Sequence, residues 1–94
     1  MPLFEYDPNK SEINEKQHGV NFVEAQELWE GNYVMIPAKD VKGENRSSIL
    51  GKIEGKIYVA IFTQRGEKLR IISCHRAGKK WEKIYEQYLQ EEKN

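Results

Sequence analysis

The segment Ile57–Ala77 contains two apolar strands joined by a tight turn, and it constrains the fold more than any other part of the chain. Tyr58–Phe62 is a continuous apolar run, which is typical of a strand covered on both faces. The turn contains Gly66, which can adopt a positive φ, and Lys68–His75 follows as the second strand. Such a hairpin has to be buried inside a sheet, so the sequence predicts a strand-rich centre.

The other elements follow from hydrophobic periodicity and turn residues. Consecutive strands joined by short turns imply an antiparallel sheet with helices packed on it, which is an α+β fold. The predicted order is β-α-α-β-β-β-β-α, in one domain spanning residues 1–94. The predicted strands are Leu3–Tyr6, Tyr33–Pro37, Arg46–Ile53, Lys56–Gln64 and Lys68–His75, the predicted helices are Pro8–His18, Asn21–Gly31 and Gly78–Gln90, and the predicted loop is Ala38–Asn45.

Two helix starts are visible in the N-terminal third of the chain. Asp7 can cap a helix that has Pro8 at its first position, and Gly19 can end that helix in the left-handed conformation. Asn21 and Glu24 have the spacing of a capping box, in which each side chain bonds the backbone N–H of the other. These signals predict two consecutive helices with a sharp break between them.

Composition predicts a soluble intracellular domain. The chain has 94 residues, of which 38% are hydrophobic and 32% charged, and no apolar run approaches the length of a membrane span. The segment Met1–Pro8 lacks the basic start and apolar middle of a signal peptide. Cys74 is the single cysteine, and a lone thiol fits a reducing compartment. We therefore expect a cytoplasmic location and no membrane partner.

Charge is distributed unevenly although the formal net charge is +0. Residues 1–31 hold two basic and seven acidic side chains, whereas residues 65–83 hold seven basic and two acidic ones. This asymmetry favours an anionic partner for the basic segment. It is equally compatible with ion pairs between the two segments of the folded chain.

Two blocks of sequence resemble the BrnT family. The first block, Phe4–Pro8 with Asn14 and Lys16–Ala25, is similar to the family pattern FEWDP…N…KHGVSFEEA. The second block, Thr63–Ala77, is similar to TERGDRIRIISARRA. Weaker matches lie at Glu44–Arg46, at Ile49–Gly51 and at Tyr85. The resemblance spans nearly the whole chain in the right order.

The resemblance implies a single BrnT-like toxin domain with a RelE-like fold. Such a toxin belongs to a type II toxin–antitoxin pair and acts as a ribonuclease that inhibits translation. Its partner is expected to be a BrnA-like antitoxin, a ribbon-helix-helix protein through which the complex contacts DNA and represses its operon. The chain departs from the family at three positions: His75 replaces an arginine, Trp81 a common glutamate and Cys74 an alanine.

Cleavage of RNA without a metal requires positive charge on the phosphate and a group that moves protons near neutral pH. Arginine supplies permanent charge with bidentate geometry, so Arg46, Arg70 and Arg76 are the predicted phosphate-stabilising residues. Histidine titrates in the right range, so His75 is the predicted acid or base, with His18 as an alternative. His18 is also the residue before Gly19, where it can instead interact with the last carbonyls of its helix.

Strict alternation along the last strand argues against a joint role for Arg70 and His75. A regular strand directs Arg70 and His75 to opposite faces, so they meet in one site only if the strand bulges. On this pattern Arg70, Ile72, Cys74 and Arg76 share one face, and Leu69, Ile71, Ser73 and His75 share the other. Arg46 can alternatively pair with an acidic residue of the N-terminal region.

The start of the last helix offers further RNA contacts. Lys79 and Lys80 are predicted to bind RNA, although they equally fit a solvated first turn. Tyr85 can stack on a base, but Trp81 and Tyr85 also fit the apolar stripe of the helix and therefore its core face. These alternatives remain open in the sequence.

Metal and nucleotide cofactors are not expected. Two histidines and one cysteine lie far apart in the chain, so no dedicated metal site is predicted. No glycine-rich loop has the spacing of a phosphate-binding motif. A second hypothesis is a non-catalytic subunit that binds its antitoxin through the basic segment.

Overall fold

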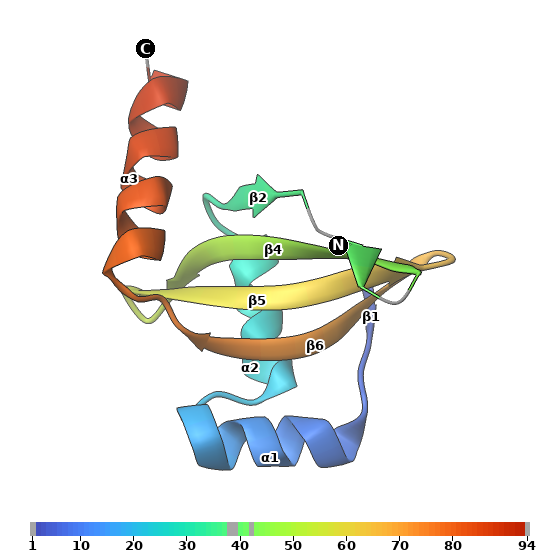
Figure 1. The fold of residues 1–94 in the computed structure, drawn as a ribbon. Coiled ribbons are helices and arrows are strands. Elements are labelled where there is room, and N and C mark those ends of the chain that lie inside the picture. The colour runs from blue at the N-terminus through green and yellow to red at the C-terminus, as the bar shows by residue number, and fades with distance from the viewer. Residues whose placement is uncertain (1, 38–39, 42, 94) are drawn as a thin grey trace.

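The computed structural model describes residues 2–37, 40–41 and 43–93. Within them the chain forms an α+β fold whose elements, in chain order, are β1 (Leu3–Glu5), α1 (Pro8–His18), α2 (Phe22–Ala25), the 3-10 helix η1 (Gln26–Trp29), β2 (Val34–Ile36), β3 (Asp40–Val41), β4 (Glu44–Ile53), β5 (Lys56–Arg65), β6 (Lys68–Arg76) and α3 (Lys79–Lys93). The sheet follows the order β1-β6-β5-β4-β2, and β3 pairs with β4 off this path (Figure 1). None of the described helices is long and apolar enough to cross a membrane.

The α+β class is confirmed, but the purely antiparallel sheet is wrong. The strands β2, β4, β5 and β6 pair antiparallel, as consecutive strands with short connections do. By contrast, β1 pairs parallel with β6, with Leu3 opposite Lys68 and Glu5 opposite Arg70. The first strand joins the edge of the sheet beside the last one, and the direction of such a distant pair cannot be predicted from connection lengths.

Other differences concern the ends of elements. The predicted loop Ala38–Asn45 contains the pair β3–β4, in which Asp40 lies opposite Asn45, while residues 38, 39 and 42 lie outside the described residues. The second predicted helix is divided into α2 and η1, and the last helix continues to Lys93 instead of ending at Gln90. Main-chain pairing close to a turn is decided by geometry that local propensity does not encode.

The predicted helix starts are confirmed in detail. Asp7 accepts hydrogen bonds from the backbone N–H groups of Asn9 and Lys10, and Gly19 ends α1 with a φ of 75°. The capping box is complete, because Asn21 accepts from the Glu24 N–H and Glu24 accepts from the Asn21 N–H. The chain therefore turns sharply between α1 and α2 and brings both against the same part of the sheet.

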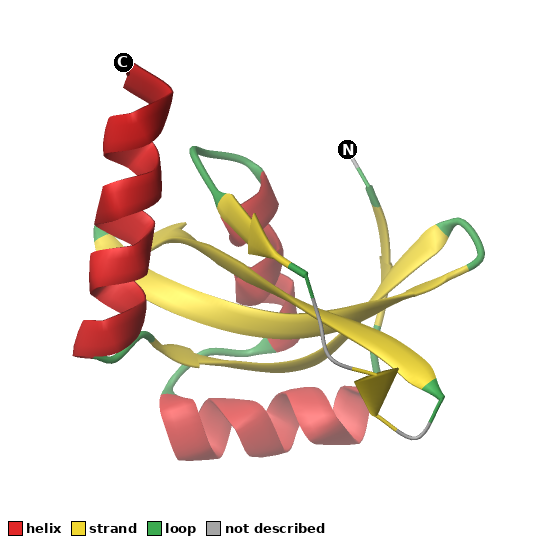
Figure 2. Cartoon of the chain, turned by 45° about the horizontal axis from the view of Figure 1, so that its top comes forward, coloured by secondary structure: helices red, strands yellow, loops and turns green. Residues whose placement is uncertain are grey.

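The two faces of the sheet are covered differently. On one face, here called the α2 face, α2 and η1 pack over a core that includes Phe22, Leu28 and Ile49. Gly51 lies beneath η1, where a Cβ would approach the Leu28 carbonyl oxygen to 3.1 Å, so a larger residue would crowd η1. On the opposite face, the α3 face, a smaller core that includes Leu50 and Tyr85 lies under α3. The helix α3 covers only one end of this face (Figures 1 and 2).

A bulge in β6 changes which side chains share a face. Ile61 of β5 pairs with Ser73, but the next residue, Phe62, pairs with Ile71, so Ile72 is an extra residue. As a result Ile71 and Cys74 both belong to the core of the α2 face, which strict alternation forbids. The predicted face assignment is therefore wrong beyond the bulge.

Candidate functional site

Four residues form a row across the part of the α3 face that lies away from α3. Arg46 of β4 lies opposite Thr63 of β5, Thr63 lies opposite Arg70 of β6, and Arg70 lies opposite Glu5 of β1. Directly opposed residues have their side chains on the same face of a sheet. We call Arg46, Thr63 and Arg70 the arginine row. Two strand spacings separate the arginine backbones, which is about 10 Å, so one extended anion can contact both.

Carboxylates hold the arginines of this row loosely. Arg70 Nη1 lies 3.8 Å from Glu5 Oε2, and Arg46 Nε lies 3.6 Å from Glu44 Oε2. Glu44 also contacts Arg65, with 3.2 Å between its Oε1 and Arg65 Nη2. The exposed fraction of each of these side chains is between 28% and 38%, for Glu5, Glu44, Arg46 and Arg70 alike. Long, partly solvated ion pairs are weak, so an incoming anion can replace the carboxylates.

Two sequence alternatives about ion pairing are decided by these contacts. Arg46 pairs with Glu44, two residues before it, and not with the acidic N-terminal region as we had considered. That region does reach the basic segment through Glu5 and Arg70. Among the described residues this is the one ion pair that joins residues 1–31 to residues 65–83. Most of the basic segment is thus not neutralised by the acidic one.

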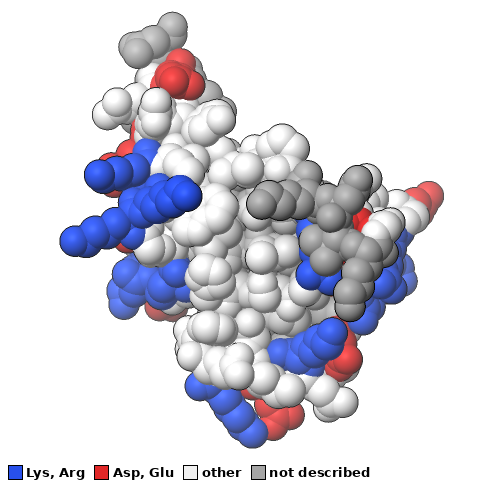
Figure 3. Space-filling view, viewed as in Figure 1, with Lys and Arg blue, Asp and Glu red and all other residues white. Residues whose placement is uncertain are grey.

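Uncharged side chains continue the α3 face toward α3. The next cross-strand row consists of Ser73, Ile61, Ser48 and Ile36, all of intermediate exposure. In Figure 3, which views the molecule as Figure 1 does, an uncharged centre lies between basic atoms over α3 and basic atoms around the opposite strand ends. In this view the middle of the described part of the face is uncharged, and positive charge lies at both sides.

The bulge places His75 on the same face as Arg70. His75 lies opposite Val59, a member of the small core under α3, and therefore faces the α3 side. Its Nδ1 lies 2.9 Å from the Arg76 carbonyl oxygen. The ring of His18, at the end of α1, lies 5.7 Å from the His75 ring, measured between centroids. The two histidines of the chain are thus neighbours in space.

Arg76 lies on the other side of the sheet. It pairs with Tyr58, and its guanidinium carbon lies 5.7 Å from the centre of the Tyr58 ring, which packs against the core of the α2 face. The structure therefore brings Arg46, Arg70 and His75 to one face and separates Arg76 from them.

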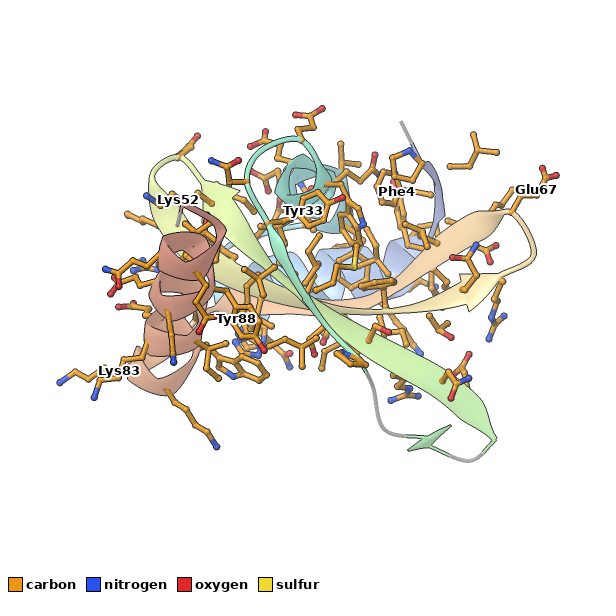
Figure 4. The ribbon with its side chains drawn as sticks, turned by 90° about the horizontal axis from the view of Figure 1, so that it is seen from above. Phe4, Tyr33, Lys52, Glu67, Lys83 and Tyr88 are labelled. Carbon is orange, nitrogen blue, oxygen red and sulfur yellow. The ribbon has the colours of Figure 1, made fainter. Side chains whose placement is uncertain are left out.

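The α3 residues divide into exposed and buried sets. Lys79 and Lys80 are exposed in the first turn, and Lys83 projects away from the sheet (Figure 4). Tyr85 is 2% exposed, and its hydroxyl donates to the Asn32 carbonyl oxygen at 2.8 Å. Burial raises the pKa of Tyr85. Trp81 packs against the same small core. Both aromatic residues therefore pack in the core under α3, which was one of the two alternatives for them.

Cys74, next to His75, has a purely internal environment. It is fully buried in the core of the α2 face, and burial, followed by the nearby Glu24, raises the pKa of its thiol to about 12. The thiol therefore stays protonated at neutral pH and is a poor nucleophile.

Sequence reasoning missed Thr63, Ser73, Glu5 and Glu44 as members of this face. Thr63 is 3% exposed, and its hydroxyl donates to the Asn45 carbonyl oxygen at 2.7 Å. Its position between the two arginines follows from strand register, for which the sequence carries no direct signal. An alternation analysis that allowed one bulge in β6 would have found Ser73.

Permanent cations, serine hydroxyls and an imidazole share the α3 face, an arrangement whose chemistry suits contact with an anion. The chain matches the family model of BrnT, described as the ribonuclease toxin of a type II toxin–antitoxin system, over residues 6–80. It therefore belongs to the BrnT toxin family, and the predicted resemblance is confirmed. No curated protein matches the chain significantly. Membership implies a ribonuclease toxin that has an antitoxin partner.

Proposed function

We propose that this protein is a metal-independent endoribonuclease of RelE-like type whose RNA lies across the α3 face, from the arginine row to His75. The observation that carries the proposal is the bulge, because it places Arg70, Ser73 and His75 on one face of the sheet. The two ends lie about 15 Å apart along β6. They therefore contact neighbouring nucleotides of one strand rather than a single phosphate.

The two ends have different tasks in this proposal. Arg46 and Arg70 bind phosphate oxygens by charge-assisted hydrogen bonds and fix the register of the strand. His75 accepts the proton of a ribose 2′-OH as its oxygen attacks the adjacent phosphorus. The bond to the 5′ oxygen breaks, that oxygen takes up a proton, and a 2′,3′-cyclic phosphate remains. No redox partner or metal is needed.

The remaining predicted residues have supporting places. Lys79 and Lys80 follow β6 directly, so they can contact the RNA strand beyond His75. Arg76 and Tyr85 are left out, since Arg76 faces the α2 side and Tyr85 is buried. We further propose that the toxin acts in the cytoplasm to inhibit translation. Its partner is a BrnA-like ribbon-helix-helix antitoxin, through which alone it contacts DNA.

A cleavage assay with a matched arginine pair tests this function. Purified protein is incubated with end-labelled single-stranded RNA in EDTA, alongside Arg70→Ala and Arg65→Ala. Both arginines pair with a glutamate, but Arg65 lies at the end of β5, outside the row. We expect cyclic-phosphate products from the wild type and from Arg65→Ala. A charge-assisted hydrogen bond is worth about 1.5–3 kcal/mol, so with the protein below its Kd for RNA we expect Arg70→Ala to cleave at least about tenfold more slowly.

The second candidate is a non-catalytic subunit that binds an acidic antitoxin segment. It is favoured by the carboxylates of Glu5 and Glu44 on the arginine row, because a docked acidic peptide presents the same groups. On this alternative the isolated protein leaves RNA intact, and Arg70→Ala weakens antitoxin binding instead. Equal cleavage by wild type and Arg70→Ala contradicts the proposed site.

A further inference from the structure

The two histidines of this chain come from opposite ends of the sequence and meet at one seam. His18 ends α1 and His75 lies near the end of β6. Their ring centroids are 5.7 Å apart, with 46° between the ring planes. His18 is exposed and His75 is half-exposed, so both rings are accessible to solvent. The two histidines are therefore neighbours at the surface and are not part of the core.

A buried asparagine fixes this seam. Asn14 is 6% exposed, and its Nδ2 donates to the Cys74 carbonyl oxygen at 2.7 Å while its Oδ1 accepts from the Cys74 N–H at 3.2 Å. The same Nδ2 donates to the Val20 carbonyl oxygen at 2.8 Å. His18 follows Asn14 by one helical turn, on the same side of α1, and His75 follows Cys74. These hydrogen bonds of Asn14 therefore hold the two rings beside each other before any ligand binds.

The hydrogen bond of His75 leaves one nitrogen available. A carbonyl oxygen can only accept, so the contact at 2.9 Å to the Arg76 oxygen requires a proton on His75 Nδ1. Nε2 then carries the free lone pair. Metal-binding histidines commonly have this arrangement, in which the second nitrogen donates to a backbone carbonyl and fixes the ring.

The local field also favours a cation. The C-terminal end of α1 carries partial negative charge and lies at His18. Two neighbouring cations are directed elsewhere, since Arg76 lies over Tyr58 on the α2 face and Lys16 pairs with Glu12. Cys74 is fully buried and is not a ligand. The described residues contain no group of three or more histidine, cysteine or acidic side chains placed for a metal, so protein ligands number two.

We propose that His18 and His75 form a surface site for one first-row transition-metal ion, with Zn²⁺ as the representative, completed by water molecules. Imidazole nitrogen is a preferred ligand of zinc, copper and nickel, whereas magnesium prefers oxygen. A metal on His75 Nε2 removes that nitrogen from proton transfer. The bound ion therefore inhibits the proposed cleavage, and this consequence alone rests on the proposed function.

Direct binding tests the site without any RNA. ZnCl₂ is titrated calorimetrically into the tag-free wild type, His18→Gln, His75→Gln and the control Gln17→Ala, which changes an exposed neighbour on α1. We expect one zinc ion per chain for the wild type and for Gln17→Ala. Each histidine variant is expected to bind at least about tenfold more weakly. Circular dichroism verifies that the variants are folded, and the two histidines lie on different elements.

Nitrogen NMR of labelled histidine locates the ligand atom. We expect zinc to shift the His75 Nε2 resonance while Nδ1 remains protonated. Three results overturn the proposal: no binding to the wild type, wild-type affinity in His18→Gln, or equal affinity for Mg²⁺ and Zn²⁺. Because these measurements contain no RNA, they can fail while the ribonuclease proposal holds, and the cleavage assay can fail while zinc binds.

Discussion

The two ends of the α3 face carry different kinds of basic side chain. At one end Arg46 and Arg70 come from different strands of the sheet and are held by the carboxylates of Glu44 and Glu5. At the other end His75 sits at a seam between a helix and a strand, beside His18. Permanent, partly paired charge suits binding, whereas an accessible imidazole suits proton transfer or metal coordination. In the proposed function, one end of this face holds the RNA and the other end reacts with it.

Replacing His75 is expected to have the largest effect. A lost general base or acid lowers rates by roughly 100- to 10,000-fold, so His75→Gln should slow single-turnover RNA cleavage by at least about 100-fold. Its affinity for RNA should change little. The matched variant at the other end, Arg46→Gln, should instead weaken RNA binding and reduce the salt dependence by about one contact. Quench-flow rates and filter binding measure both. If both variants change the same parameter, the division of tasks is wrong.

Replacing Asn14, whose hydrogen bonds tie α1 to β6, should have the second-largest effect. Asn14→Ala deletes three hydrogen bonds with buried partners, each costing about 1 kcal/mol or more. We expect a loss of about 3 kcal/mol in the free energy of unfolding, measured in urea. The exposed control Gln17→Ala, on the same helix, should stay within about 0.5 kcal/mol. A small loss in Asn14→Ala would mean that α1 is held to β6 mainly by other contacts.

Alkaline pH should lower the free energy of unfolding through Cys74, which lies on the strand that joins the two ends. The raised pKa of Cys74 means that the unfolded chain releases this proton first, near pH 9, and the folded chain only near about 12. The contribution of this thiol to the free energy of unfolding is therefore constant below about pH 9 and falls above it, by up to about 1.4 kcal/mol per pH unit. Urea unfolding at pH 8 and 10 measures the fall. Cys74→Ala should show a shallower fall, with Tyr85 contributing to what remains, and an unchanged slope would exclude the thiol as its cause.

The smallest effect is expected from removing the carboxylate that pairs with Arg70. Glu5→Gln removes the carboxylate beside Arg70, and a partly exposed pair is worth about 0.2–1 kcal/mol. RNA binding should therefore tighten by up to about fivefold. The control is Glu12→Gln, whose partner Lys16 lies on α1 away from the row. Weaker binding by Glu5→Gln would show that the carboxylate positions Arg70 rather than competing with RNA.

Local chemistry in the sequence predicted the elements well. Asp7, Gly19 and the Asn21–Glu24 capping box each act within a few residues, so their outcome does not depend on the rest of the chain. The alternation of apolar residues likewise placed β4, β5 and β6 within two residues of their ends. The parallel direction of β1 and the pairing of β3 were missed, because both depend on partners brought together by folding.

The candidate site shows the same limit. The sequence contained the residue types of the candidate site, and strict alternation indicated that Arg70 and His75 meet only if the last strand bulges. It held no signal for the bulge at Ile72, for Thr63 between two arginines, or for the burial of Tyr85. Each of these depends on strand register or on packing against another element.

By itself the sequence determined the caps, the apolar hairpin, the uneven charge and the family. The tertiary structure decided which charges share a face and that His18 lies beside His75, although their separation in the chain argued against a metal site. The physical reason is how far apart in the chain the interacting residues lie. Helix caps and periodicity arise from hydrogen bonds and burial within one element. The site arises from register between strands and from one buried asparagine that joins α1 to β6.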